Sequence, residues 1–590
     1  MADLASQPTV IQSLYSWFRE GKLYVNRQYQ RKLVWTLEEK QKLIESIQKQ
    51  YPIPAILLSE RSDGSGIFEI IDGLQRLHAI FSFIENSFPD LEDNFFDVSQ
   101  FATAKTYADD NIFEVESSAQ KLSAKGVSTI LDYTLALSIM RNSNDEEIND
   151  VFDRINTYGH RLSDQERRQA GVSTSFSTLV RTLACSVRGD VSVEKLPLYD
   201  MPSISIDLPK MQHGYDVRAD EVFWVDSGVL RSTDLRDSLD EQVIADLIAC
   251  VVGPELITRS KVTLDELYNS NSKTSSDLAS QLEVYGPEKM EDEFKYVLAE
   301  IIKMCGSGGE GKLKEILFNK PNSNSFPSIF SFIFLALHEK IIAENKKISD
   351  YKALKDALTD CGASLTQGQK ATAPAERRKN VNIVKGLMED VFVDDKDPRN
   401  HIYVDASLTD IENWVRRSGM ELSNYELKQG ILRLDGKNEI DDNVVEKIFK
   451  TACAMANIGP NNTGKIILGV CDSPNDAERI LEIHGVSGKQ VASRTIVGIR
   501  REAEALNWTI EEYFQYLRDQ LSGSGLSEPL KSGILTNLDF NSYYELGILV
   551  IKVPPMDEPS YLDEEMFWRE GDQTILAKSA KDIATIVQRF

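Results

Sequence analysis

The chain has 590 residues, of which 42% are hydrophobic and 27% charged, a globular composition that argues against a largely disordered protein. Its formal net charge of -26 disfavours indiscriminate coating of nucleic acid, because phosphate binding needs a positive field. No apolar run reaches about 18 residues, and no basic-then-apolar leader opens the chain. We therefore expect a cytoplasmic protein with no membrane-spanning segment and no secretory signal.

The spacing of cysteine and histidine argues against two further classes of protein. The six cysteines lie far apart with no CxxC pair, and the six histidines form no HExxH motif. This pattern predicts reduced thiols, with neither a disulfide scaffold nor a zinc ribbon.

The order of predicted elements suggests an α/β protein with two α+β heads and a helical middle. Residues 10–175 mix short strands and helices, residues 176–395 are mainly helical, and residues 402–590 return to alternating strands and helices. Residues 361–377 are rich in small and polar side chains, which favours a linker there.

The first region contains a polar turn between a buried strand and a helix. Thr36 and Glu39 have capping-box spacing, and an apolar helical period follows them. In chain order, we expect a helix over 37–49, strands over 55–59 and 67–71, a polar turn over 72–76 and a helix over 77–84.

This turn has the residue types of a phosphate site. The N–H groups at a helix start attract anions, and Gly73 lets the backbone approach closely. Arg76 can form a bidentate fork, and Asp72 can hold a metal or orient a water. Residues 21–50 carry seven Lys or Arg and three Glu, so the neighbourhood is locally positive. The alternative is a solvated turn with Arg76 in a surface salt bridge.

Two ordered signatures give this region a family resemblance. Residues 29–31 (YQR), 51–54 (YPIP) and 71–76 (IDGLQR) are followed by 151–159 (VFDRINTYG) and 165–168 (QERR). Together they resemble the N-terminal ParB-like domain of the GmrSD-type modification-dependent restriction family, whose signature reads DGQQR. Leu74 stands at the third letter of that signature, so one amide is missing.

The resemblance implies a domain that binds or hydrolyses a nucleoside triphosphate and gates a separate nuclease. It implies Asp72, Gln75 and Arg76 as catalytic residues. The implied nucleotide-binding set is Gln30, Arg31, Asp72, Gly73, Gln75, Arg76, Asn156, Glu166 and Arg167.

The last region places carboxylates around a pair of strands. An apolar helix ends near residue 457, and an apolar strand over 464–470 leads to Asp472. Glu426 and Lys428 share a strand face, the pairing of a metal-holding acid with a phosphate-steadying lysine. Glu421 can converge with Glu426 only if it precedes that strand on a loop. The alternative is that all three acids are solvated.

A second resemblance covers about 170 residues. Residues 421–428 (ELSNYELK), 454–457 (AMAN), 464–470 (GKIILGV), 546–553 (LGILVIKV) and 567–571 (FWREG) resemble the AlbA-like domain of the Schlafen family. The resemblance implies nucleic-acid binding, and RNase relatives imply Glu421, Glu426 and Asp472 as metal ligands and catalytic residues, with Lys428 beside them. Candidates for phosphate contact are Arg416, Arg417, Arg494, Arg500 and Arg501.

Three hypotheses from different classes follow. The chain is a nucleotide-gated nuclease of bacterial defence against phage or modified foreign nucleic acid, it is an NTPase with a non-catalytic DNA or RNA sensor, or it is a regulatory scaffold. The first two imply a nucleoside triphosphate and Mg²⁺ or Mn²⁺, and the middle helices would couple the two heads. DNA versus RNA, and a homo-oligomer versus partner defence proteins, stay open.

Overall fold

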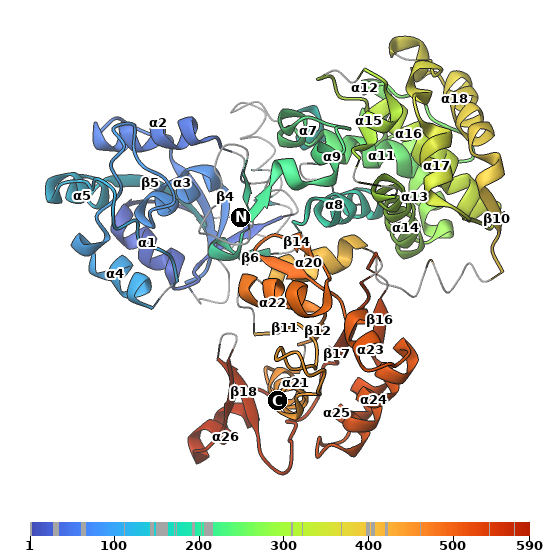
Figure 1. Ribbon diagram of the computed structural model, residues 1–590. Helices are drawn as coiled ribbons and strands as arrows, with labels where there is room; N and C mark the ends of the chain where they lie inside the picture. Colours follow the sequence, from blue (N-terminus) through green and yellow to red (C-terminus); the bar gives the residue numbers. More distant parts are fainter. Residues whose placement is uncertain are drawn as a thin grey trace. The chain divides into compact units, whose positions relative to one another are not determined.

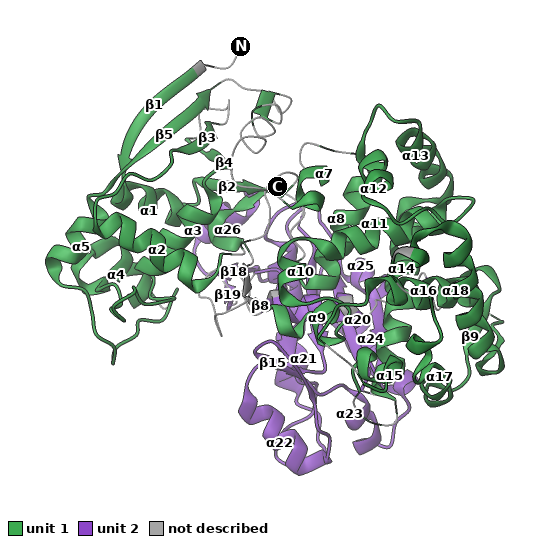
Figure 2. Ribbon diagram, turned by 90° about the horizontal axis from the view of Figure 1, so that it is seen from above, with its two compact units in different colours: residues 1–398 green, residues 399–590 purple. Residues whose placement is uncertain are grey.

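The computed structural model describes residues 3–27, 33, 35–60, 66–110, 112–141, 147–148, 151, 163–169, 172, 174–190, 195–201, 203–205, 216–307, 309, 311–320, 323–366, 368–396, 402, 408–418, 423–460, 462–541, 543–544, 546–570 and 573–590. It is a mixed α/β structure whose chain divides into two compact units, residues 1–398 and 399–590 (Figure 2). The regions expected at 10–175 and 176–395 fall within the first unit. Among the described residues, no helix is long and apolar enough to cross a membrane.

The N-terminal part of unit 1 is built on a six-stranded mixed sheet of order β1-β5-β3-β4-β2-β6 (Figure 1). β2 pairs in parallel with β4, so the two strands end at the same edge of the sheet. β6 pairs with β2 and therefore extends this head beyond the expected boundary at 175. The elements are β1 Asp3–Val10, α1 Ile11–Arg19, β2 Leu23–Asn26, α2 Leu37–Gln48, β3 Ile56–Glu60, β4 Phe68–Asp72, α3 Leu74–Ile84, α4 Ala102–Asp109, α5 Ala124–Leu131, β5 Thr134–Arg141 and β6 Lys195–Pro197.

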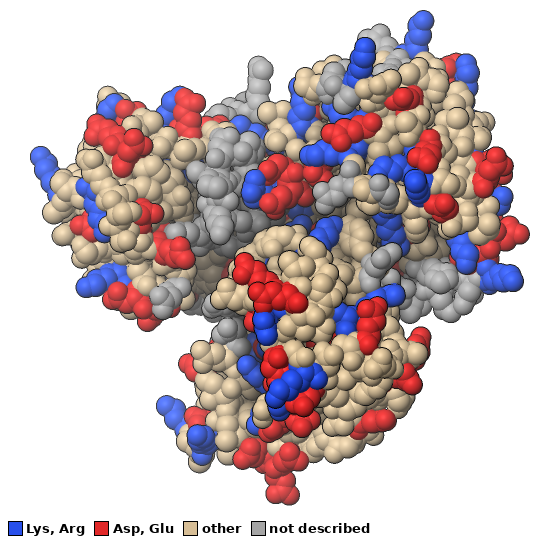
Figure 3. All heavy atoms as spheres, viewed as in Figure 1, with Lys and Arg blue, Asp and Glu red and all other residues tan. Residues whose placement is uncertain are grey.

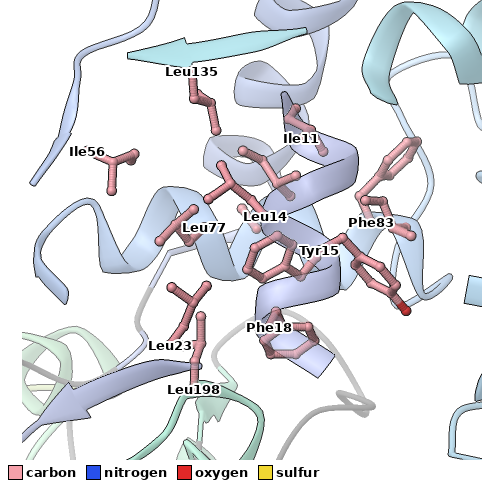
Figure 4. Close-up of a cluster of buried hydrophobic side chains, with 14 of the residues drawn as sticks. Ile11, Leu14, Tyr15, Phe18, Leu23, Ile56, Leu77, Phe83, Leu135 and Leu198 are labelled. Atoms are coloured by element: carbon pink, nitrogen blue, oxygen red, sulfur yellow. The ribbon is translucent and has the colours of Figure 1, made fainter. Parts of the chain in front are cut away.

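Helices α1 and α3 form the core with one face of this sheet. Ile11, Leu14, Tyr15 and Phe18 of α1 recur at the spacing of one helical face and are all buried. Figure 4 shows them facing Leu77 and Phe83 of α3, together with Leu23, Ile56, Leu135 and Leu198. The expected capping box at the start of α2 is confirmed, because Thr36 and Glu39 bond each other's backbone N–H groups.

The middle of unit 1 is helical, as expected. Its elements are α7 Asp164–Gln169, α8 Ser175–Arg188, β7 Ser203–Ser205, β8 Asp216–Arg218, α9 Phe223–Asp226, α10 Ser232–Arg236, α11 Leu239–Val252, α12 Lys261–Tyr268, α13 Lys273–Tyr285, α14 Pro287–Gly306, α15 Leu313–Leu317, α16 Pro327–His338, β9 Lys346–Ile348, α17 Tyr351–Leu358, α18 Pro374–Leu387 and β10 Phe392–Asp394.

Buried ion pairs join the head to these helices and the helices to one another. Arg27, directly after β2, donates to Asp190, which follows α8, at 2.5 Å. Arg188 of α8 donates to Asp240 of α11 at 2.8 Å. All four side chains are almost fully buried. Removing one partner would leave an uncompensated charge in the interior, so these pairs strongly favour one arrangement of head and helices.

The predicted linker at 361–377 is wrong. Arg377 is buried at the start of α18 and forms a bidentate pair with Asp246 of α11, with N–O distances of 2.8 and 2.7 Å. Cys361 and Ala371 are also buried. The small residues of this segment allow short 3₁₀ turns that pack against the helices, so small size here serves packing and not flexibility.

Unit 2 is built on a four-stranded sheet of order β11-β12-β17-β16, with a three-stranded sheet β13-β15-β14 and the hairpin β18-β19. Helix α21 lies against both β12 and the hairpin. The elements are α20 Leu408–Ser418, β11 Tyr425–Lys428, α21 Asp442–Ala456, β12 Gly464–Leu468, β13 Val470–Cys471, α22 Pro474–His484, β14 Lys489–Val491, β15 Arg494–Ile496, α23 Arg500–Ala505, α24 Ile510–Gly523, α25 Leu530–Thr536, β16 Leu538–Asn541, β17 Ile548–Val553, β18 Phe567–Glu570, β19 Gln573–Leu576 and α26 Ala580–Val587.

Gly73 shapes the turn between β4 and α3. Its φ of +100° lies in a region that favours glycine, and a Cβ added there would stand 2.3 Å from Ile56 Cδ1. The sequence therefore needs glycine at this position for both backbone conformation and packing.

We expect Gly73→Ala to destabilise unit 1 more than Gly66→Ala does. Gly66 also has positive φ, but a Cβ there meets nothing within 4 Å. The left-handed backbone costs about 1–2 kcal/mol in either variant, and overpacking against Ile56 adds about 1–3 kcal/mol in Gly73→Ala alone. Thermal unfolding of the two variants measures the difference, and equal melting temperatures would contradict the packing argument.

Candidate functional site

Figure 3 shows how charge is distributed on one face of the molecule. On the face shown in Figure 3, acidic and basic side chains of the described residues are interspersed and form no continuous basic surface. With a net charge of -26, a phosphate group can be attracted only where cations are gathered locally.

Unit 2 contains such a place, a cleft of about 540 Å³ at the end of β11. Three cations and two carboxylates line it, so the lining carries a formal excess of one positive charge. The lining residues are Ser418, Tyr425, Glu426, Leu427, Lys428, Lys447, Asp472, Arg494, Gln573 and Thr574. The structure thus brings together three of the residues predicted as catalytic, Glu426, Lys428 and Asp472.

Strand β11 places Glu426 and Lys428 on the same face, as expected. Lys428 Nζ lies 2.5 Å from Glu426 Oε1, and β11 is held in register by its parallel partner β12. The second oxygen, Oε2, accepts a hydrogen bond from Arg569 Nη1 at 3.0 Å. Both carboxylate oxygens of Glu426 are therefore engaged by cations.

A break between β12 and β13 directs Asp472 into the same cleft. Gly469 has a φ of +107°, and a Cβ there would lie 3.0 Å from the Cα of Gly498. The Gly469 N–H donates to the Lys428 carbonyl at 2.8 Å, which ties the end of β12 to the end of β11. The sequence predicted one continuous strand over 464–470, and this close approach of two backbones explains why the chain bends instead.

The side chain of Asp472 is 52% exposed, so the cleft encloses it only in part. This partial burial raises the pKa of Asp472, Lys428 and Arg494 oppose the shift, and the nearby Glu426 adds to it. Arg494 donates to the Asp472 carbonyl and lies 3.5 Å from Asp472 Oδ1. The two carboxyl groups of the cleft consequently interact with each other and share the neighbouring cations.

The five arginines predicted to contact phosphate have different environments. Arg494 lines the cleft, whereas Arg500 is exposed at the start of α23. Arg416 of α20 pairs with Glu412 at 3.3 Å, and the side chain of Arg417 lies outside the described part of the chain. Arg501 is only 4% exposed and donates to the Gln429 carbonyl, so it supports the fold and does not face the cleft.

The carboxylates of the cleft suit a hard divalent cation. Mg²⁺ is commonly held by one or two carboxylates together with substrate phosphates and waters, and Glu426 and Asp472 supply two carboxylates on one cleft. Glu421, the third predicted ligand, lies outside the described residues. Within the described ranges, no three or more His, Cys, Asp or Glu side chains are grouped to hold a metal ion. Of the three predicted ligands, the structure therefore places two, Glu426 and Asp472, on one cleft.

The sequence argument missed the cleft residues that come from α21 and β19. Lys447 of α21 and Gln573 and Thr574 of β19 reach the cleft from elements far along the chain. Lys447 lies in an ordinary helical pattern, and nothing in that pattern indicates a functional residue. Thr574 stands in a strand recognisable by its family resemblance, and its pairing with Arg569 across the hairpin is a consequence of register.

The predicted strand–turn–helix form is present, but the turn is shorter than the expected 72–76. Only Gly73 lies between β4 and α3, so Gln75 and Arg76 are in the first turn of the helix. Arg76 is used within this region. Arg76 donates to the carbonyls of Pro54 and Ala55, and Nη2 lies 2.8 Å from Asp72 Oδ2. Asp72 also accepts the Gly73 N–H at 2.6 Å. The guanidinium thus joins the end of β4 to the chain before β3, and the surface salt bridge considered from the sequence is present within a larger network.

The other predicted nucleotide contacts fall in several places. Gln75 Oε1 accepts the Trp35 N–H at 3.3 Å, which attaches the turn to the segment before α2. Glu166 accepts the Ser163 N–H at 2.9 Å and caps α7, while Arg167 is exposed and pairs with Asp164. Gln30, Arg31 and Asn156 lie outside the described residues.

The burial of position 74 explains why this chain can depart from the DGQQR signature there. Its side chain is 3% exposed and belongs to the hydrophobic core of the head. In this chain the third position of the signature therefore faces the interior, and the missing amide is replaced by apolar packing.

Two separate regions of the chain match known protein families. Residues 11–172 match the family model of the GmrSD restriction endonuclease, N-terminal domain, and residues 421–578 match the model of the Schlafen AlbA_2 domain. The chain carries both domains, which confirms the two resemblances seen in the sequence. No curated protein and no solved structure shows significant similarity to it.

We expect Leu74→Gln, which restores the signature glutamine, to destabilise unit 1. Burying an amide without partners costs about 1–3 kcal/mol, whereas the volume-conserving control Leu74→Met costs less than about 1.5 kcal/mol. Thermal unfolding compares the two variants. A Leu74→Gln protein as stable as wild type would show that position 74 can turn outward.

Proposed function

We propose that the cleft of unit 2 binds a nucleic-acid strand through its phosphates and cleaves it, under control of a nucleotide-binding N-terminal domain. The observation that carries this proposal is the cleft itself. In a protein of net charge -26, three cations and two carboxylates line one cavity of about 540 Å³. Cations that hold phosphate beside carboxylates that can hold Mg²⁺ or Mn²⁺ are the parts that phosphodiester hydrolysis needs.

We assign two different roles to the residues of the cleft. Lys428, Lys447 and Arg494 provide the positive field for phosphate oxygens, and Glu426 and Asp472 provide the oxygen ligands. A divalent ion bound there would acidify a water and stabilise charge developing on the phosphate. Lys428 is 16% exposed and bonded to Glu426, so an entering phosphate can take over its ammonium group.

The substrate we favour is foreign or modified DNA in bacterial defence. This follows from the restriction-endonuclease description of the N-terminal family, which matches residues 11–172. The Schlafen match of residues 421–578 makes RNA the second substrate to test.

One observation favours a second function, a nucleic-acid sensor without cleavage. Both oxygens of Glu426 already have cationic partners, Lys428 and Arg569. If neither partner gives way, the cleft binds phosphate but offers no open carboxylate for a metal. Cleavage assays separate the two functions.

We expect Glu426→Gln and Asp472→Asn each to reduce cleavage by at least about 100-fold, since even the outer partners of metal ligands contribute ~10–100-fold. Binding of the same strand in EDTA should be retained, because each change removes a negative charge from the cleft. Fluorescent single-stranded DNA, duplex DNA and RNA are incubated with Mg²⁺ or Mn²⁺, with and without nucleoside triphosphate.

The control is Glu446→Gln on α21, whose carboxylate pairs with Lys450 and is not part of the cleft lining. It should cleave as wild type does. Cleavage that survives in both cleft variants would place catalysis elsewhere, and binding without cleavage of any substrate would establish the sensor.

The proposal for the N-terminal domain is binding, with or without hydrolysis, of a nucleoside triphosphate at the turn 72–76. Its support is the family match together with the local geometry. The start of a helix lacks intrahelical acceptors for its first N–H groups and favours an anion, and no side chain within the described ranges caps the start of α3. Asp72 is half-exposed beside it and is available for Mg²⁺.

We expect one of the four nucleoside triphosphates, with Mg²⁺, to raise the melting temperature of wild type by a few degrees. A ligand at 100 times its Kd stabilises the native state by about 2.7 kcal/mol. Arg76→Ala should lose this shift because the turn is no longer held to residues 54 and 55. The control Arg141→Ala breaks an exposed pair with Glu60 on the same sheet and should keep the shift. No shift in wild type, with nucleotide or nucleic acid, would favour a scaffold.

A further inference from the structure

Beside the cleft lies a cation that is almost completely buried. Arg569 is on β18, its side chain is 1% exposed, and β18 packs beside α21 (Figure 1). A buried guanidinium loses its hydration, so it is tolerated only where the protein supplies acceptors for its N–H groups.

Arg569 finds these acceptors mainly on the strand that carries Glu426. Nε donates to the Ser423 carbonyl at 3.1 Å, and Nη2 donates to the Tyr425 carbonyl at 3.2 Å. Nη1 donates to Glu426 Oε2 and to Thr574 Oγ1, each at 3.0 Å. A single planar side chain therefore fixes the backbone on both sides of residue 424 and one oxygen of the Glu426 carboxylate.

The hairpin partner of Arg569 extends this support into the core. Thr574 is the residue directly opposite Arg569 in the β18–β19 register, and its hydroxyl lies 3.1 Å from that of Thr451 on α21. The chain of contacts runs from α21 through Thr574 and Arg569 to Glu426. Because three of the four acceptors are backbone or hydroxyl oxygens, Arg569 keeps most of its hydrogen bonds when the Glu426 carboxylate shifts.

Lys428 differs from Arg569 in each of these respects. It is more exposed, and it holds Glu426 Oε1 through a flexible stem and a compact ammonium group. Besides Glu426, its Nζ donates to the Leu427 carbonyl at 3.0 Å. Lys428 can thus exchange Glu426 for a phosphate, whereas Arg569 cannot leave without breaking strand β11 from the hairpin.

We propose that Arg569, supported by Thr574, is a positioning residue that holds the Glu426 carboxylate in its reactive orientation while Lys428 is released to substrate. This rests on the proposed cleavage function. The inference also assigns a role to the β18–β19 hairpin. The hairpin lines the cleft and, through Arg569, holds the strand that bears the reactive carboxylate.

The test substitutes Arg569 with lysine, which keeps the charge but cannot span four acceptors with a planar fork. We expect Arg569→Lys to lower kcat for strand cleavage by about 10–100-fold, the range for outer partners of metal-binding carboxylates. KM should stay within about threefold. Thr574→Val, which removes one acceptor at similar side-chain volume, should lower kcat by a smaller factor.

The matched control is Arg589→Lys. Arg589 supports the same hairpin from elsewhere, by donating to the Asn457 carbonyl at 2.8 Å and stacking over Trp568. We expect Arg589→Lys to keep the wild-type kcat, and the melting temperatures of both variants are measured so that any loss of kcat is compared at temperatures where both are folded. Equal loss of kcat in both variants would show that the hairpin acts through stability alone and would overturn the inference.

A crystal structure of the 590-residue chain carrying Arg569→Lys separates this inference from the proposed function. The expected result is a Glu426 carboxylate that is displaced or disordered while β11 still pairs with β12. Glu426 unchanged in that structure would overturn the inference even if cleavage falls. If wild type cleaves no substrate, the proposed function fails, and a displaced Glu426 would still establish the positioning role.

Discussion

A half-enclosed carboxylate held between two cations is the interaction on which the cleft of unit 2 depends. Removing a carboxylate from water costs free energy unless cations or hydrogen bonds compensate for the lost hydration. Arg569 and Lys428 provide that compensation at opposite oxygens of Glu426, Arg569 from a buried planar fork and Lys428 from a flexible stem. One of the two counter-charges is therefore fixed, whereas the other is exchangeable. Asp472, whose pKa is raised by burial, completes a pair of carboxyl groups in unequal environments.

The interactions that stabilise the N-terminal turn differ from those in the cleft. In the turn, the arginine of the signature is engaged by two backbone carbonyls and by Asp72, so it stabilises the turn as well as lying near a potential ligand. Gly73 is required by its close approach to Ile56, and Leu74 anchors the start of α3 in the core. Much of the signature thus specifies a rigid strand–turn–helix, on which Asp72 and the helix start are presented. Buried pairs such as Arg27 with Asp190 then fix this head against the helices of unit 1.

The local parts of this structure could be predicted from sequence, and the long-range parts could not. Capping residues, apolar periods and family signatures predicted α2, β4 and α3 to within a few residues, and period-two spacing predicted that Glu426 and Lys428 share a face. Nothing local indicates that Arg569 reaches back 143 positions to Glu426, or that Arg377 in a segment of small residues pairs with Asp246. Such contacts depend on tertiary packing. The predicted linker failed for this reason, because small residues permit tight packing as readily as flexibility.

Charge placement links the acidic composition to the selectivity of the cleft. A chain of net charge -26 repels a polyanion at long range, and its visible face offers no continuous basic surface to offset that repulsion. Among the described residues of the cleft, Lys428, Lys447 and Arg494 outnumber the two carboxylates, which gives a local attraction for phosphate. Under the proposed function, long-range repulsion and this short-range attraction act in opposite directions and disfavour unselective binding of nucleic acid. A strand would then be retained when a phosphate enters far enough to take Lys428 from Glu426, which would couple binding to the release of the carboxylate.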